Sequence, residues 1–355
     1  MHGLRGVIIT QVLDEADPVL AFAVGWVNAL AARVEHLDAV CLSRGEAALA
    51  ANVRVTILPP GRFARYRRVR TLLRRLRHDA ALDFVLAHMC PSYAVAATFP
   101  TKLAPTFLWY AHSSITRMLR AADRRSDRVF SCSEASYPLP GPRLRVVGHG
   151  IDTGRFTPPD TSPRGEAFTI CSVGRITPSK RLDRLVEALA QYRERELGAA
   201  FLCRIIGPAI EPYSRTLQSL IDGSNLGDLV RIEPPVAHRD VARAYRAADL
   251  VANMTTRHSL DKATLEAMAC GCLVLTTNDA FRPVLGKHAE LMVKTDASPE
   301  ALAGAIERLA ALPAGERAQI GAELRQTIVR DHSLERMMDR IVEDIRATLD
   351  EKGRR

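Results

Sequence analysis

The residues whose types and spacing could do chemistry lie in two segments, VGRITPSKRLDRL and SLDKATLEAMACG. The first begins at the end of the apolar run Phe168–Val173, whose length and turn-forming flanks are typical of a buried strand. Gly174, Arg175 and Lys180 follow in a short loop before a predicted helix. A glycine turn, two cations and a helix N-terminus together can form a binding site for a phosphate-bearing ligand. The alternative is an ordinary strand–loop–helix unit whose basic residues are solvated.

The helix that should position these cations is predicted from apolar residues that recur at helical spacing, at Leu182, Leu185, Val186 and Leu189. Such an apolar stripe is typical of a helix that packs on a sheet. We expect Thr177 or Ser179 to cap its first turn, because hydroxyl side chains accept from the free N–H groups of a helix start.

The second segment places a carboxylate, Glu266, on a short helix made otherwise of small and apolar residues. We expect Ser259 or Asp261 to cap this helix and Gly271 to end it. A carboxylate in such surroundings needs a hydrogen-bonding partner. The vicinal hydroxyls of a ribose would supply two donors, and the alternative is a salt bridge to an arginine nearby in space.

A third candidate is His112, in the segment LWYAHSS directly after the predicted strand Thr106–Tyr110. The carboxyl ends of parallel strands are where open α/β sheets bind ligands, which favours a functional histidine at this place. The alternative is a structural histidine, which is the commoner role of a lone histidine.

The elements that must position these residues alternate between strand and helix along the whole chain. Apolar runs predict strands from Gly6–Thr10 onward in the first half and from Phe168–Val173 onward in the second, and amphipathic helices separate them. This alternation is typical of an α/β protein with doubly wound parallel sheets. The stretch 148–166, rich in glycine, proline and threonine, is predicted to be a linker between two such domains.

The composition is typical of a folded protein without disulfides. The chain has 355 residues, of which 47% are hydrophobic and 25% charged, enough for two or three domains. The seven cysteines are scattered and form no Cys-x-x-Cys pair, so we expect neither a disulfide framework nor a zinc site. No apolar run approaches the roughly 18 residues of a membrane span, and the N-terminus lacks a signal-peptide layout. We therefore expect a cytoplasmic protein.

The formal net charge of +9 favours acidic partners, and the most basic stretch is 62–77, RFARYRRVRTLLRRLR. Its eight arginines alternate with apolar residues at a spacing that suits a helix with one apolar and one cationic face. Such a helix could lie peripherally on an anionic membrane surface, at the inner face of the membrane. The alternative is a surface helix that packs on the sheet and solvates its arginines. No nucleic-acid partner is expected, because the stretch has little aromatic interleaving and belongs to no nucleic-acid-binding motif.

Taken together, VGRITPSKRLDRLVEAL and LEAMACGCLVLTTN resemble the two donor-site signatures of glycosyltransferase family 4, and LWYAHSS and GHGIDTGRF extend the resemblance over nearly the whole chain. The resemblance implies a GT-B fold, in which two Rossmann-like domains face each other across a cleft. Residues 1–150 would form the acceptor-side domain and 151–332 the donor domain, with the helix of 333–355 crossing back to the first. It also implies retaining transfer of a sugar from a nucleoside-diphosphate donor, with no metal and no cofactor.

The family's signature residues correspond to the candidates above. The arginine and lysine that hold the donor diphosphate correspond to Arg175 and Lys180, which follow Gly174. The glutamate that binds the donor ribose corresponds to Glu266, and the histidine near the transferred sugar corresponds to His112. Two cations and two helix N-termini can stabilise a departing phosphate dianion without a metal.

Three further positions are expected at the donor. Lys262 and Ala263 lie at the start of the second helix, and Val236 lies in a turn expected near the nucleotide base. One position departs from the family pattern, because His258 stands where the family's first glutamate is usual, eight residues before the ribose-binding one. We expect Asp261 or His258 to contact the hydroxyls of the donor sugar in its place.

The resulting prediction is a retaining glycosyltransferase of the hexosyltransferase type. It would move a sugar from a UDP- or GDP-sugar to a glycan or lipid-linked acceptor in the biosynthesis of cell-surface polysaccharide or glycolipid. The change at His258 leaves two alternatives, a catalytically silent nucleotide-sugar-binding protein of the same fold and a nucleotide-sugar epimerase. The sequence leaves the sugar, the base and the acceptor open.

Overall fold

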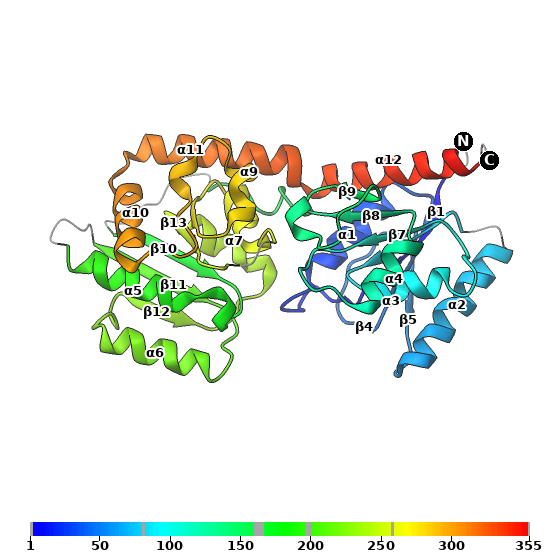
Figure 1. Ribbon diagram of the computed structural model, residues 1–355, viewed down its shortest axis with the longest axis horizontal. Helices are drawn as coiled ribbons and strands as arrows, with labels where there is room; N and C mark the ends of the chain where they lie inside the picture. The colour runs from blue at the N-terminus through cyan, green and yellow to red at the C-terminus, as the bar shows by residue number, and fades with distance from the viewer. Residues whose placement is uncertain (1–2, 80–81, 160–166, 196–199, 257–258, 354–355) are drawn as a thin grey trace. The chain divides into compact units, whose positions relative to one another are not determined.

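The computed structural model describes residues 3–79, 82–159, 167–195, 200–256 and 259–353. By its internal contacts the chain divides into two compact units, which can be followed by colour in Figure 1. Unit 1 comprises Met1–Gly150 and Asp331–Arg355, and unit 2 comprises Ile151–Arg330. Each unit is a parallel sheet with helices packed on it, which confirms the α/β fold class expected from the sequence.

The large sheet of unit 1 has seven parallel strands in the order β5-β3-β1-β6-β7-β8-β9. The strands are β1 (Arg5–Ile9), β3 (His36–Cys41), β5 (Val53–Ile57), β6 (Phe84–His88), β7 (Thr106–Trp109), β8 (Arg128–Ser131) and β9 (Leu144–Val146). A second, two-stranded sheet pairs β2 (Val12–Leu13) with β4 (Ser43–Arg44). The chain builds outward from β1 to β5 on one side and then from β6 to β9 on the other, so the strand order reverses between β1 and β6.

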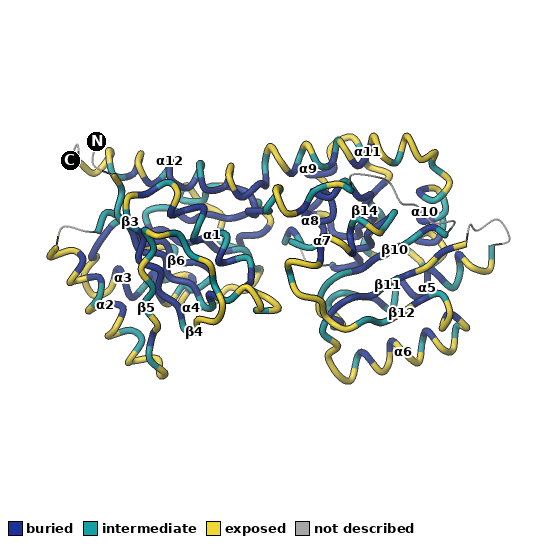
Figure 2. The backbone as a smooth tube through the Cα atoms, turned by 180° about the vertical axis from the view of Figure 1, so that it is seen from behind, coloured by how far each residue is buried: buried dark blue, intermediate teal, exposed yellow. Residues whose placement is uncertain are grey.

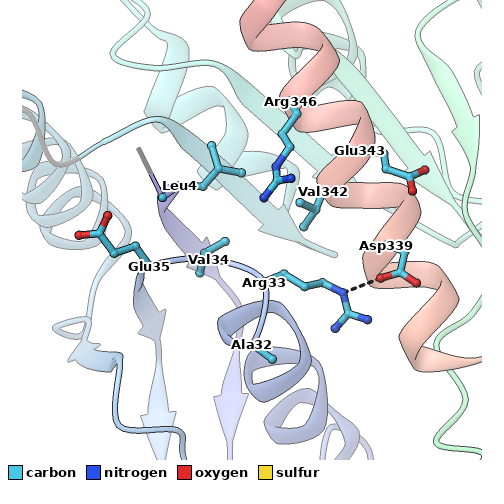
Figure 3. Close-up of a pocket in the computed structure, with 10 residues that line it drawn as sticks. Leu4, Ala32, Arg33, Val34, Glu35, Asp339, Val342, Glu343 and Arg346 are labelled. Atoms are coloured by element: carbon cyan, nitrogen blue, oxygen red, sulfur yellow. Dashed lines mark hydrogen bonds and ion pairs between the residues drawn. The ribbon is translucent and has the colours of Figure 1, made fainter. Parts of the chain in front are cut away.

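The helices of unit 1 are α1 (Phe22–Ala31), α2 (Arg62–His78), α3 (Pro91–Thr98), α4 (Arg117–Arg125) and α12 (Leu334–Gly353). Helix α3 packs between α2 and α4, and α12 packs on α1. Figure 3 shows α12 beside the segment that follows α1, where Arg33 Nε donates to Asp339 at 2.8 Å. A groove of about 500 Å³ lies along this contact. The last helix of the chain is therefore part of the packing of unit 1.

The arginine-rich segment forms the predicted helix α2, but one of its arginines is not on the exposed face. Arg70 is 3% exposed, and its guanidinium donates to the carbonyl oxygen of Ala96 at 2.9 Å and to that of Phe99. These oxygens lie at the C-terminal end of α3, where a cation is favoured. The outer side of α2 is exposed along most of its length (Figure 2). No helix in the described part of the chain, α2 included, is long and apolar enough to cross a membrane.

The sheet of unit 2 has five parallel strands in the order β12-β11-β10-β13-β14. They are β10 (Phe168–Val173), β11 (Phe201–Ile206), β12 (Val230–Glu233), β13 (Leu250–Asn253) and β14 (Leu273–Thr276). β10 lies at the centre, pairs with β11 over its whole length, and is buried at most positions. A central strand buried on both faces explains the near-continuous apolar run in its sequence.

The helices of unit 2 are α5 (Leu182–Arg193), α6 (Tyr213–Gly223), α7 (His238–Arg246), α8 (Lys262–Ala269), α9 (Arg282–Leu285), α10 (Pro299–Ala311) and α11 (Ala314–Thr327). Helix α5 packs on α6 and α10, and α8 packs on α7 and α11. The interior is filled by large side chains such as Tyr192, Tyr245 and Phe281, none of them more than 1% exposed. Helix α8, which carries the predicted carboxylate, is therefore held between two other helices.

The stretch 148–166 was predicted to be a linker, and its described part is firmly packed. Ile151 is 0% and Phe156 1% exposed. The ring of Phe156 lies 5.5 Å from that of His238 and 6.1 Å from that of Tyr245, both on α7. Phe156 thus fastens this segment to α7, although the composition of the segment is that of a loop.

Candidate active site

Unit 2 offers a ligand site where its strand order reverses. The chain runs from β10 outward to β11 and β12 and then returns to β13 on the other side of β10. In doubly wound sheets such a reversal is where ligands bind, outside the carboxyl ends of the strands. The loop after β10 carries Gly174, Arg175 and Lys180, and the segment after β13 leads to Asp261 at the start of α8. The two segments singled out in the sequence therefore follow neighbouring strands of one sheet.

Direct contacts join these two segments. Thr255 Oγ1 donates to the carbonyl oxygen of Ser179 at 3.1 Å. Lys180 Nζ forms an ion pair with Asp261 Oδ2, and the two side chains are 25% and 15% exposed. Asp261 Oδ1 accepts from the N–H of Ala263 at 3.1 Å, which confirms the predicted cap of α8. Asp261 thus places the ammonium of Lys180 beside the first turn of α8. A helix N-terminus attracts anions, so an anionic ligand could meet both the ammonium and the helix start.

Glycines let the loop after β10 pass close to its neighbours. Gly174 has a φ of 137°, and a Cβ there would lie 3.5 Å from Lys180 Nζ. Gly207, which follows β11, has a φ of 154°, and a Cβ there would overlap the carbonyl oxygen of Gly174. The ammonium of Lys180 therefore lies beside the residue that precedes Arg175, and both cations belong to one small region of unit 2.

The cations of this region differ in what holds them. Arg175 is exposed and has no hydrogen bond or ion pair with any described residue. Arg181 and Arg184 instead donate to the carbonyl oxygens of Thr295 at 3.2 Å and Ala297 at 2.6 Å. Arg175 is thus available to a ligand, whereas Arg181 and Arg184 fasten α5 to the segment that precedes α10.

The start of α5 differs from the prediction. The hydroxyls of Thr177 and Ser179 lie 3.0 Å apart, and neither caps the helix. A short 3-10 turn, Pro178–Lys180, comes first, and α5 begins after Arg181, whose backbone is left-handed with a φ of 49°. The prediction of a hydroxyl cap was wrong because this extra turn places both hydroxyls before the helix start.

Glu266 is only 4% exposed, and the structure gives it a partner that the sequence did not suggest. His238 Nε2 lies 3.0 Å from Glu266 Oε1, so the expected alternative, a salt bridge to an arginine, is wrong. Burial, together with the nearby Glu266 carboxylate, raises the pKa of Tyr245 well above its usual value. His238 had no signal in the sequence beyond its place at the edge of a predicted helix, because it meets Glu266 only through the packing of α7 on α8.

The other predicted donor positions lie at the same edge of the sheet. Val236 follows β12 and is 41% exposed, and Lys262 and Ala263 are the first two residues of α8. His258, expected to contact the donor sugar, lies outside the described residues. Within the parts of the chain that are described, histidine, cysteine, aspartate and glutamate side chains nowhere gather in threes that could hold a metal ion.

His112 belongs to unit 1 and follows β7, the strand next to β6. Its Nδ1 accepts the N–H of Ser114 at 3.0 Å. In a neutral ring the proton must then lie on Nε2, which can donate a hydrogen bond to a ligand. At the strand reversal of this unit, the buried His88 Nδ1 and Thr10 Oγ1 lie 2.9 Å apart. The structure thus places His112 at the carboxyl edge of its sheet, as the sequence predicted.

Residues 155–327, which contain the whole site of unit 2, match the family described as Glycosyl transferases group 1. The D-inositol 3-phosphate glycosyltransferase of Actinosynnema mirum is 33% identical over 183 residues, which are 47% of this chain and 42% of that relative. The chain belongs to the glycosyl transferases group 1 family. This confirms the family predicted from the two signatures. The matches to this and other curated D-inositol 3-phosphate glycosyltransferases cover less than half of the length of each of those proteins.

Solved structures show the fold of this group 1 protein over nearly its whole length. A glycosyltransferase from Rickettsia africae has a TM-score of 0.77 at 16% identity, covering 97% of this chain and 99% of that one. Anabaena HepE in complex with UDP-glucose has a TM-score of 0.72 at 17% identity, covering 97% of this chain and 100% of that one. At such identities the likeness shows the fold alone, and it confirms the predicted GT-B class.

Proposed function

We propose that this protein is a retaining glycosyltransferase whose donor is a nucleoside-diphosphate sugar, with unit 2 as the donor domain and unit 1 as the acceptor-side domain. The observation that carries the proposal is the contact of Lys180 with the capping residue of α8 at the strand reversal of unit 2, beside Arg175, which no described residue pairs with. Two cations and a helix start can stabilise a departing diphosphate. Further along α8, the carboxylate of Glu266 can accept hydrogen bonds from ribose hydroxyls.

The transfer needs no strong protein base. The bond between the anomeric carbon and the diphosphate oxygen breaks, and the acceptor oxygen bonds to that carbon on the same face. The acceptor's proton passes to the departing phosphate oxygen. Arg175 and Lys180 stabilise that phosphate, while His112 Nε2–H holds a hydroxyl of the transferred sugar, so geometry contributes more than a tuned pKa. A contact of Asp261 or His258 with the sugar stays a prediction, and in the structure Asp261 holds Lys180.

The nucleotide is UDP or GDP. The complex of Anabaena HepE with UDP-glucose supports a nucleotide sugar as donor for a chain of the same fold. Val236, 41% exposed beyond the end of β12, is the residue that we place near the base. The sugar is a hexose, and the acceptor is a glycan or a lipid-linked sugar.

A thermal-shift panel of UDP, GDP and their hexose conjugates tests the donor. A ligand at about a hundred times its Kd should stabilise the protein by about 2.7 kcal/mol. The shift should shrink in Arg175→Ala and persist in Arg215→Ala, a matched control because Arg215 is an exposed arginine of α6 that pairs with Glu211. If no nucleoside diphosphate raises the melting temperature, the proposed donor site is wrong.

Turnover tests the reaction. Arg175→Ala should raise the barrier by about 2–4 kcal/mol, the usual effect of losing one charge-stabilising donor, and Arg215→Ala should leave it unchanged. Wild-type turnover in Arg175→Ala contradicts the phosphate role. Nucleotide binding without transfer to any acceptor would support the silent alternative, and epimerisation without an acceptor would support an epimerase.

The exposed face of α2 motivates a membrane-associated acceptor. Four of its arginines are exposed and have no hydrogen bond or ion pair with any described residue: Arg62, Arg67, Arg68 and Arg74. Phe63, in the first turn of the same helix, is 88% exposed. Unpaired cations beside an exposed aromatic ring are suited to anionic lipid headgroups. We therefore place the acceptor reaction at the inner membrane surface, with the protein bound peripherally.

Liposome co-sedimentation tests this surface. Binding to anionic liposomes should fall with added salt and be lost when glutamine replaces Arg67, Arg68, Arg74 and Arg75. The control removes four exposed arginines from unit 2 instead: Arg215, Arg231, Arg239 and Arg282. Equal loss in both variants would indicate a non-specific charge effect, and no binding by the wild type would exclude the membrane surface.

A further inference from the structure

We propose that His238 positions the Glu266 carboxylate and so makes the pair the part of the donor site that selects ribose over deoxyribose. This inference rests on the proposed function, because it concerns the same nucleotide. His238 is a positioning residue and acts through Glu266. The pair lies within unit 2, where α7 packs on α8.

The carboxylate has one partner that can orient it. Glu266 sits between residues of α8 that are not exposed at all, Leu265, Ala267 and Met268. Its side chain is 6% exposed, and among the described residues its Oε1 hydrogen-bonds only with His238 Nε2, at 3.0 Å. A nearly buried carboxylate without a hydrogen-bond donor is strongly disfavoured, so this contact fixes the orientation of the Glu266 carboxylate.

The imidazole ring is itself held from two other directions. Its edge meets the ring of Phe156, with centroids 5.5 Å apart and planes at 65°. Its Nδ1 lies 3.5 Å from a guanidinium nitrogen of Arg155, which can only donate. Nδ1 is therefore the accepting nitrogen, and Nε2 carries the proton that goes to Glu266. Phe156 is 1% exposed, so the packed segment before β10 fixes the ring plane.

This arrangement leaves Glu266 Oε2 for a ligand. An ionised carboxylate accepts about four hydrogen bonds through its two oxygens, and His238 uses one of them. The 2′ and 3′ hydroxyls of a ribose lie on neighbouring carbons, so both can donate hydrogen bonds to one carboxylate. A site built to accept from a hydroxyl discriminates against the analogue that lacks it, because the buried acceptor is then left unpaired.

Isothermal titration with UDP, GDP and their 2′-deoxy forms tests the inference. The wild type should prefer the ribonucleotide by about tenfold to a hundredfold, the effect of one hydrogen bond to a charged group. His238→Asn should reduce this preference by about fivefold, because its amide reaches only the position of Nδ1. His238→Gln, whose amide reaches the position of Nε2, should restore it. A loss of packing alone would weaken ribo- and deoxyribonucleotides equally in both variants.

His288→Gln is the matched control, since His288 also contacts two carboxylates of unit 2, those of Glu290 at 3.1 Å and Glu323 at 2.8 Å. It should keep the full ribose preference. If the wild type binds no nucleoside diphosphate, the proposed function itself fails. If the wild type prefers ribose and both His238 variants keep that preference, or if the wild type has no preference, the inference about His238 is overturned while the donor site stands.

Discussion

Lys180 and Arg175 are assigned the same ligand but contribute differently to the unliganded protein. Lys180 is paired with Asp261, which is 15% exposed, whereas Arg175 has no partner among the described residues. Removing Lys180 takes away the ammonium that pairs with this mostly buried carboxylate. We therefore expect Lys180→Ala to lower the free energy of unfolding by about 1–3 kcal/mol, and Arg175→Ala to change it by no more than about 0.5 kcal/mol. Urea unfolding monitored by circular dichroism measures both.

A double variant separates this pair from a general effect at the loop. If the ion pair is the cause, Lys180→Ala and Asp261→Ala together should cost less than the sum of the two single changes. Strict additivity, or equal stability of the Arg175 and Lys180 variants, would show that the pair contributes nothing before the donor binds.

Residue types and spacing singled out Arg175, Lys180 and Glu266 as candidates, but not the residues that contact them. Lys180 meets Asp261 across 81 positions of sequence, and Glu266 meets His238 across 28. Local patterns contain no information on such pairs, because the partners are chosen by which helix packs on which strand end. The sequence therefore named the charged residues of the candidate site, but its alternative of an arginine as the partner of Glu266 was wrong, since the partner is His238.

At the scale of elements, one arginine of the cationic helix α2 is buried and holds the end of α3. Arg70 donates to the carbonyl oxygens of Ala96 and Phe99 from a site that is 3% exposed. Arg70→Ala should lower the free energy of unfolding by about 2–4 kcal/mol, because it removes the guanidinium donor from both oxygens, of which only that of Phe99 keeps a second donor, the Tyr66 hydroxyl. Thermal unfolding of this variant beside Arg67→Ala, an exposed neighbour expected to be neutral, measures the difference. Similar melting temperatures for both would mean that the end of α3 finds other donors.

The close passage of the loops after β10 and β11 is a second feature at this scale. A Cβ on Gly207 would overlap the carbonyl oxygen of Gly174, which precedes the exposed Arg175. Gly207→Ala should therefore displace that loop, weaken binding of the nucleoside diphosphate by at least about tenfold and destabilise the protein by about 1–3 kcal/mol.

Gly223→Ala is the control for this change, since nothing lies within 4 Å of a Cβ there and the residue ends α6. It should leave nucleotide affinity unchanged and stabilise the protein slightly, because alanine suits a helix better than glycine. Unchanged nucleotide affinity in Gly207→Ala would mean that the loop after β10 is not rigidly held.

Elements with a strong apolar period were predicted well, and those without one were missed. β10 has the predicted bounds, Phe168–Val173, because a central strand is buried at most positions and is therefore mostly apolar. α3 (Pro91–Thr98) went unpredicted because it is short, rich in alanine and buried on most sides, so it has no polar face. α4 (Arg117–Arg125) went unpredicted for the opposite reason, since only Leu119 and Ala122 are buried.

At the scale of the whole molecule, the chain passes between its units twice, after Gly150 and after Arg330. The second passage is a π-helical segment, Ile328–His332, a form often found at functional positions. Gly148 packs against it, since a Cβ there would lie 3.2 Å from the Cα of His332. His332 is 7% exposed, and its Nδ1 has no hydrogen-bond partner in the described structure. A buried, unpaired imidazole at this place should make stability depend on pH.

Burial lowers the pKa of His332 from its ordinary value of 6.5 to about 4, with Asp331 opposing the shift and Arg340 adding to it. Between these values the unfolded chain binds a proton that the folded chain does not. The contribution of neutral His332 to the free energy of unfolding is therefore complete above about pH 6.5 and is lost as the pH falls towards 4, by roughly 3 kcal/mol in all. Urea unfolding at about pH 7 and about pH 5 should show a smaller loss for His332→Gln than for the wild type. His78→Gln, whose histidine side chain is 90% exposed, should keep the wild-type loss. If His332→Gln loses as much stability as the wild type, other groups cause the acid sensitivity and the second passage does not respond to pH.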